Sequence, residues 1–159
     1  MPITPLHAGV LAPINHWFPG KVSNLSFWLI TLWLDANAIV YYGMGLELGA
    51  LHGPGTHSLL GALIGAGIIA LFNMVSLAWV LGAVLGAVTH ILLDMLVHAE
   101  MQPLFPYTTN PFYWGDMGLI SVILIAPFVW LTAQYVSGCL DWARKTLEAE
   151  PPEPPEPGV

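Results

Sequence analysis

Charged side chains are scarce in this sequence. Only 8% of its 159 residues are Asp, Glu, Lys or Arg, whereas 56% are hydrophobic, and the mean hydropathy is +0.70. A soluble domain carries about 25% charged residues, so this composition is that of an integral membrane protein. With only three Lys and Arg, the chain lacks the basic surface that nucleic-acid binding requires, and we expect no nucleic-acid partner.

Cysteine is almost absent as well. The single Cys139 excludes an intramolecular disulfide and a zinc site built on cysteine ligands. Residues 1–20 have no basic segment and are interrupted by prolines, so they do not read as a cleavable signal peptide. We therefore expect the internal spans themselves to direct membrane insertion.

Four apolar segments are expected to cross a membrane as helices. They cover about residues 25–42, 57–74, 77–98 and 118–138, close to the roughly 17–25 residues that a span requires. A shorter helix over residues 5–17, with Thr4 as its N-cap and a kink at Pro13, is expected to be partly inserted or interfacial. The predicted fold class is all-α: a polytopic membrane helix bundle with four full spans plus a short N-terminal helix.

Polar and turn-forming residues separate these segments. Ser23 or Asn24 is expected to cap the first span, and Thr56 the second. Residues 43–55 form a polar connection with several turn formers. Residues 99–117, rich in proline and aromatic side chains, are typical of an ordered interfacial loop that shapes access to a site.

The C-terminal end differs in composition from the rest of the chain. We expect residues 1–147 to form one membrane-embedded bundle that carries the metal site, with a membrane exit at residues 141–145. Residues 148–159 are acidic and rich in proline, a composition typical of a disordered tail.

The three basic residues indicate an orientation. Lys21 precedes the first span, and Arg144 and Lys145 follow the last. Four spans put both flanks on one side of the membrane, which the positive-inside rule makes cytoplasmic.

Ionisable residues recur at one depth of this arrangement. His90, Asp94 and His98 are four residues apart, and each such step turns a helix by only about 40°, so the three share one stripe. Ionisable groups inside a membrane are costly and are usually functional. Under this topology, and if the N-terminal helix dips in from outside, the metal-capable residues that converge near the outer face are His7, Asp35, His57, His90, Asp94 and His98.

Imidazole and carboxylate groups are good ligands for zinc, and also for manganese or iron. We expect one divalent ion, zinc in the first instance, to be held by Asp35, His57, His90 and Asp94. Asp94 is expected to bridge to a second ion held by His7 and His98.

Loop residues supply further candidates. Asp94 and His52 are the predicted catalytic residues, His52 being alternatively a ligand, the partner of a ligand or a proton carrier. Glu100 and Asp116 are weaker candidates for a late ligand or base, because polar loop residues are commonly just solvated.

Several of these motifs resemble a known family. They are Met1-Pro2-Ile3-Thr4-Pro5-Leu6-His7, Leu34-Asp35, His52 with His57-Ser58-Leu59-Leu60, and His90-Ile91-Leu92-Leu93-Asp94. Together they are similar to the membrane-bound metal-dependent hydrolases described as LexA-binding and inner-membrane-associated, over about residues 1–140. Their order is also similar to the first part of the zinc-dependent phospholipase C pattern. That pattern continues with a further His and Glu, whereas this chain has no His after His98, so one or two metals are expected rather than three.

The resemblance implies a function. The chain is expected to be an integral membrane metal-dependent hydrolase that uses metal-activated water on a phosphoester of a lipid or other amphiphile. Membrane lipid and this substrate are the expected partners, and no protein partner is indicated. The expected location is a prokaryotic inner membrane, crossed several times, with the site toward the outer face.

Two other functions fit the same residues. One is a small transporter or channel in which metal ions or protons pass through the His/Asp site. The other is a non-enzymatic membrane adaptor that recruits a soluble partner through the acidic tail.

Overall fold

The computed structural model describes residues 4–45 and 52–148, and every regular element among them is a helix. The elements are α1 (Thr4–His7), the 3-10 helix η1 (Ala8–Val10), α2 (Leu11–Trp17), α3 (Asn24–Gly43), α4 (Leu59–Leu71), α5 (Leu77–Val97) and α6 (Met117–Glu148). The all-α class is therefore confirmed. The predicted tail, apart from Glu148, lies outside the described residues, as does Met1–Ile3 of the opening motif.

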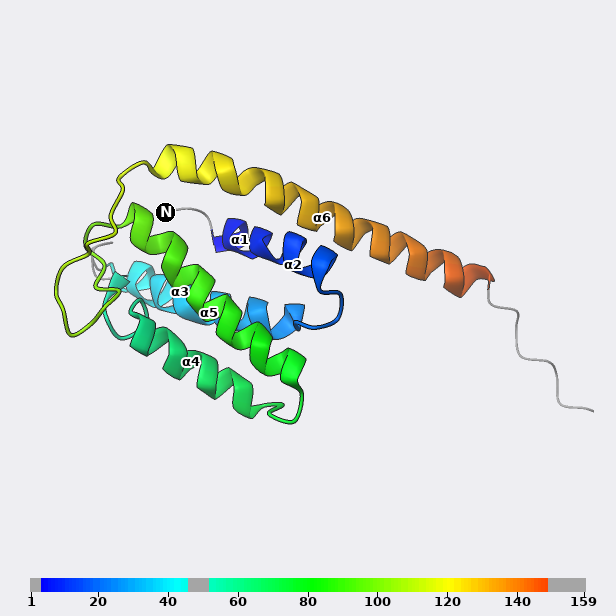
Figure 1. Ribbon diagram of the computed structural model, residues 1–159, viewed down its shortest axis with the longest axis horizontal. Coiled ribbons are helices and arrows are strands. Elements are labelled where there is room, and N and C mark those ends of the chain that lie inside the picture. The colour runs from blue at the N-terminus through cyan, green and yellow to red at the C-terminus, as the bar shows by residue number, and fades with distance from the viewer. Residues whose placement is uncertain (1–3, 46–51, 149–159) are drawn as a thin grey trace, which may run out of the picture.

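Helix α5 forms the centre of the bundle. It packs against α3 and α4, while the N-terminal segment α1–η1–α2 lies between these helices and α6 (Figure 1). Helix α6 contacts the bundle mainly through that segment, and its C-terminal part extends beyond the other helices. Residues 4–17 are thus held in place by α6.

Small residues on α5 allow α3 to approach closely. The buried residues of α5 recur every three or four positions and are Gly82, Ala83, Gly86, Ala87, His90, Ile91, Asp94 and Val97. A Cβ atom on Gly86 would lie 2.9 Å from the backbone oxygen of Phe27, so the α3 backbone leaves no room for a side chain there. The close approach brings α3 against the same face that carries His90 and Asp94 further along.

The predicted N-terminal helix is present but is not continuous. Its middle tightens into η1 just before Pro13, whose missing N–H cannot bond to the carbonyl of Gly9. Gly9 also lies against α6, where a Cβ atom would be 2.8 Å from the nitrogen of Phe128. The interruption therefore falls where the segment crosses α6.

Within residues 4–45 and 52–148, two helices, Leu77–Val97 and Gly118–Glu148, are long and apolar enough to cross a membrane, fewer than the four expected spans. Helix α4 has 13 residues, about 20 Å of helix, and is shorter than the expected segment 57–74. Helix α3 has 20 residues and carries Asp35 in its second half. Helix α6 continues past the exit predicted at residues 141–145, because that stretch contains neither Gly nor Pro to end it.

The start of α4 differs from the prediction, while the start of α3 agrees with it. Ser23 caps α3 by accepting a hydrogen bond from the Ser26 N–H at 3.3 Å. Thr56 does not cap α4; the N-cap is Ser58, whose hydroxyl oxygen accepts from the Gly61 N–H at 3.0 Å. Ser58 has the extended backbone that an N-cap requires. His57 therefore lies in the turn before α4 rather than in the helix.

Residues 99–116 form an irregular loop, as predicted, and this loop covers the C-terminal end of α5. The side-chain amide of Asn110 donates to the backbone oxygens of Met95 and His98, at 2.7 and 2.8 Å. These carbonyls have no partner within the helix. The Leu59 N–H donates to the Pro103 oxygen at 2.9 Å, so the loop joins the end of α5 to the start of α4.

The close approach of α3 and α5 can be tested with two alanine variants. We expect Gly86→Ala to destabilise the protein by about 1–3 kcal/mol, because the added methyl group meets the α3 backbone. Gly67→Ala is the matched control on α4, since its Cβ would have no neighbour within 4 Å and alanine favours helix. Thermal unfolding in detergent is the measurement, and equal melting temperatures for the two variants would contradict this account of the packing.

Candidate metal centre

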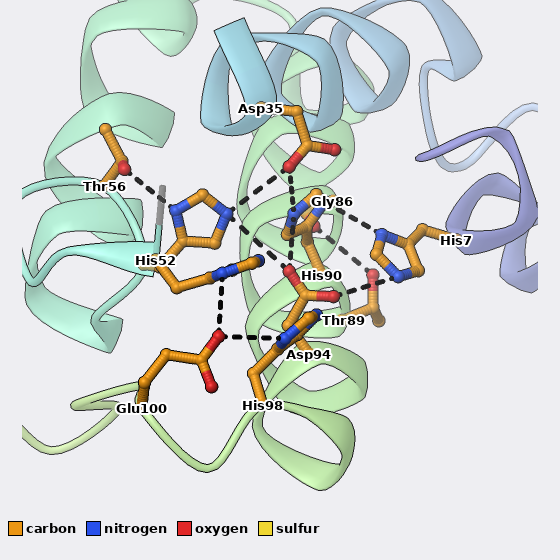
Figure 2. A network of polar contacts seen from close by, with 11 residues as sticks. His7, Asp35, His52, Thr56, Gly86, Thr89, His90, Asp94, His98 and Glu100 are labelled. Carbon is orange, nitrogen blue, oxygen red and sulfur yellow. Dashed lines mark hydrogen bonds and ion pairs between the residues drawn. The ribbon is translucent and has the colours of Figure 1, made fainter. Parts of the chain in front are cut away.

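A group of four donors, three buried and one half-buried, lies where three segments of the chain meet. Asp35 comes from α3, His57 from the turn before α4, and His90 and Asp94 from α5 (Figure 2). The side chain of Asp35 is 16% exposed, and those of the other three are at most 3% exposed. The structure thus brings together the four residues expected to hold the first metal.

The distances within this group are those of ligands around one ion. His90 Nε2 lies 3.4 Å from Asp35 Oδ1 and 3.2 Å from Asp94 Oδ2. His57 Nε2 lies 3.4 and 3.7 Å from the same two oxygens, and all four groups offer an atom within 4.8 Å of the others. Around a tetrahedral zinc with bonds of about 2.0–2.1 Å, neighbouring ligand atoms are roughly 3.3 Å apart. The group therefore has the dimensions to hold a divalent metal ion.

The nitrogen of His90 provides a test of this fit. Within the described part of the chain, His90 Nε2 makes no hydrogen bond of good geometry, although both carboxylates lie within 3.4 Å of it. A buried polar atom without a hydrogen bond lowers the stability of the folded protein by about 1–3 kcal/mol. His57 Nε2 makes a long hydrogen bond to Asp35 Oδ1, at 3.4 Å. A nitrogen placed as His90 Nε2 is, close to two carboxylates without a good hydrogen bond, is arranged as a metal ligand, and this donor set suits zinc, manganese or iron.

The outer nitrogens of the two ligand histidines also have partners. His57 Nδ1 is 2.9 Å from the hydroxyl of Thr56, and His90 Nδ1 is 3.2 Å from Nδ1 of His7. Such contacts orient ligand histidines in metal sites. His7 also places its Nε2 3.3 Å from Asp94 Oδ1, so it contacts two of the four donors.

A second group lies beside the first, and it differs from the predicted pairing of His7 with His98. His98 stacks on His52, with ring centroids 3.8 Å apart and planes at 23°. Glu100 Oε1 lies 3.3 Å from Nδ1 of both rings (Figure 2). These three residues are also close enough together to hold a metal ion.

Burial favours the uncharged form of both histidine rings in the second group. Burial, followed by the neighbouring His98 and His57, lowers the pKa of His52 to about 4. Burial likewise lowers the pKa of His98 below its usual value. Neutral imidazole has the free lone pair that binds a metal.

Sequence reasoning undervalued two residues near these groups. Glu100 was a weak candidate because it lies in a loop, and Thr56 was assigned a capping role. In the sequence, the only indication that Glu100 or Thr56 lies at a metal site is its proximity to a histidine. Asp116, the other loop candidate, is instead a helix cap, since its Oδ1 accepts from the Leu119 N–H at 2.8 Å.

The chain matches no protein-family model, curated protein or solved structure. The interpretation of both groups therefore rests on the identity of their residues and on their geometry.

Removing one central carboxylate should abolish metal binding at the first group. We expect Asp94→Asn to lower metal affinity by more than about 100-fold, because losing only the partner of a ligand costs about 10–100-fold. Elemental analysis of the purified protein, with competition by a chelating dye, measures this. Asp116→Asn is the control, since asparagine also caps helices. Equal metal content in the two variants would contradict the assignment.

The contact between Thr56 and His57 should contribute measurably to metal affinity, although less than a metal ligand does. We expect Thr56→Val to weaken metal binding by about 10–100-fold, since the His57 ring loses the hydroxyl that orients it. Thr132→Val, at an exposed site where the hydroxyl bonds only within α6, should leave the affinity unchanged. The same dye competition compares both variants with the wild type, and an unchanged affinity in Thr56→Val would refute the orienting role.

Proposed function

We propose that this protein is an integral membrane metal-dependent hydrolase of the family that its motifs resemble, acting on a phosphoester of a lipid or other amphiphile. The observation that carries the proposal is the buried group of four donors within 4.8 Å of one another, set among apolar helices. Intramembrane groups of this kind mark functional sites.

The distribution of apolar side chains supports a membrane location. Only 17% of the most apolar part of α6 is buried. Helix α4 exposes Leu60, Leu63, Ile64 and Ile68 to the surroundings, while the polar donors lie inside. A soluble monomer rarely exposes so much contiguous apolar surface. We infer that α3 and α4 also lie in the membrane, as shorter elements beside the two candidate spans.

The positions of the basic residues support an outward-facing site. The turn between α2 and α3, which carries Lys21, lies at the end of the bundle away from the start of α4 and the end of α5 (Figure 1). The C-terminal part of α6, which carries Arg144 and Lys145, extends in the same direction. By the positive-inside rule that end is cytoplasmic, so we assign the site to the outer face of a prokaryotic inner membrane.

The donor set suits hydrolysis of a phosphoester. A bound divalent metal supplies a Lewis acid and lowers the pKa of water toward neutrality. The carboxylates of Asp35 and Asp94 would balance the charge of such a cation, and the imidazoles of His57 and His90 would be its other protein ligands. Because Asp94 is enclosed by His7, His57 and His90, we assign it as a ligand rather than as a mobile base.

The loop over the site supports an amphiphilic substrate. Its exposed aromatic side chains include Phe105, Tyr107, Phe112, Tyr113 and Trp114. Aromatic residues prefer the headgroup level of a membrane. A substrate with an apolar tail in the membrane would present its polar group at this level.

Transport is a less suitable function for this site. Next to it, α3, α4 and α5 pack a core of aliphatic side chains, among them Ile30, Leu34, Ala66 and Ala87. No chain of polar groups crosses this core among the described residues. A transported ion or proton would need such a path.

The proposal predicts metal-dependent turnover of phosphodiesters or phospholipids by the purified protein. We expect a chelator to abolish turnover, zinc or manganese to restore it, and His57→Ala to lower it by at least about 100-fold, as typical losses of catalytic groups do. Deleting residues 149–159 should leave turnover unchanged, whereas an adaptor would lose its function.

Other outcomes select the alternatives. A wild-type protein that contains no metal would refute the proposal. Metal-ion or proton flux into proteoliposomes without hydrolysis would identify a transporter.

A further inference from the structure

The group of His52, His98 and Glu100 has the features of a metal position in its own right. The nearly parallel rings are 3.8 Å apart, so the two Nδ1 atoms lie side by side, each 3.3 Å from Glu100 Oε1. These separations again match those of ligand atoms around one tetrahedral ion, about 3.3 Å.

Unpaired nitrogen atoms in this group are an independent observation. His52 and His98 are 5% and 6% exposed. Among the described residues, His52 Nδ1 and His98 Nε2 have no hydrogen-bond partner of good geometry. The buried Nδ1 of His52, which has no hydrogen bond of good geometry, is stabilised if a cation binds between it, the Nδ1 of His98 and the carboxylate of Glu100.

The two groups differ in ligand number. The first offers four protein ligands, so a metal there would need a fifth position to bind water, an expansion that zinc allows. The second offers three, the number typical of sites that keep a position open for water or substrate.

The two groups also differ in charge and exposure. Two carboxylates neutralise a divalent cation in the first group, whose Asp94 is 2% exposed. In the second group, a divalent cation with the single carboxylate of Glu100 would carry a net charge of +1. The side chain of Glu100 is 45% exposed, so solvent can stabilise this charge.

We propose that His52, His98 and Glu100 hold a second divalent cation, which exchanges with solvent and keeps open coordination positions, while the four-residue group encloses a first cation that exchanges slowly. The two positions are adjacent, since the rings of His52 and His57 are 4.9 Å apart. This inference concerns metal binding, so it does not depend on whether the protein hydrolyses a phosphoester.

Metal counting on the full-length protein in detergent tests the proposal. After equilibration with zinc, we expect the wild type to bind two equivalents, of which a weak chelator removes one rapidly. Glu100→Gln should bind the second equivalent at least tenfold more weakly and keep the slowly exchanging one. His98→Gln should behave in the same way, while Glu148→Gln, on an exposed carboxylate at the end of α6, should match the wild type.

The outcomes separate this inference from the proposed function. If Glu100→Gln and His98→Gln still bind two equivalents with wild-type affinity, or if the wild type binds only one and loses it in Asp94→Asn, the second position is refuted and the first stands. A wild type that binds no metal refutes both. Circular dichroism of each variant confirms that a loss of metal does not come from unfolding.

Discussion

The burial of two carboxylates among apolar helices is the constraint on which the rest of this structure depends. An uncompensated charge in such surroundings costs several kcal/mol, yet Asp94 is 2% exposed and Asp35 lies next to it in the same group. Three imidazoles, those of His7, His57 and His90, lie within 3.7 Å of these carboxylates. Each comes from a different segment, so the site holds together parts of the chain that are distant in sequence.

The rest of the bundle makes this convergence possible. The glycines of α5 let α3 approach until Asp35 reaches the face that carries His90. Ser58 starts α4 one residue after His57, which leaves His57 in a turn where its ring can face inward. The loop after α5 then fixes the end of that helix, with Asn110 bonded to the carbonyl of His98. The backbone conformation at these positions thus determines where the side chains of the site lie.

The sequence predicted the components of the site better than their grouping. Helical periodicity was sufficient to place His90 and Asp94 on one face, and the cost of charges in apolar segments was sufficient to single out Asp35. Which histidine pairs with which depends on how separate helices pack, and no local pattern contains that information. His98 therefore joined His52 and Glu100 rather than His7, because the residues after Val97 leave the helix and turn back toward the start of α4.

Segment lengths were also harder to predict than segment types. The second span was expected to cover residues 57–74, but a cap at Ser58 and a turn after Leu71 confine α4 to 13 residues. At the other end of the chain, helix-favouring residues extend α6 past the expected exit. Hydropathy describes the preference of a segment for its surroundings, whereas these boundaries are set by capping and by backbone propensity.

The placement of the N-terminal segment between α6 and the other helices has a consequence for biogenesis. The segment that holds His7 is synthesised before α6, yet it packs against α6. Until α6 is complete, the N-terminal segment lacks one of the two surfaces that enclose it. Assembly of the site is therefore coupled to the synthesis of α6, and a chain truncated before α6 would leave the N-terminal segment that carries His7 without one of its packing surfaces.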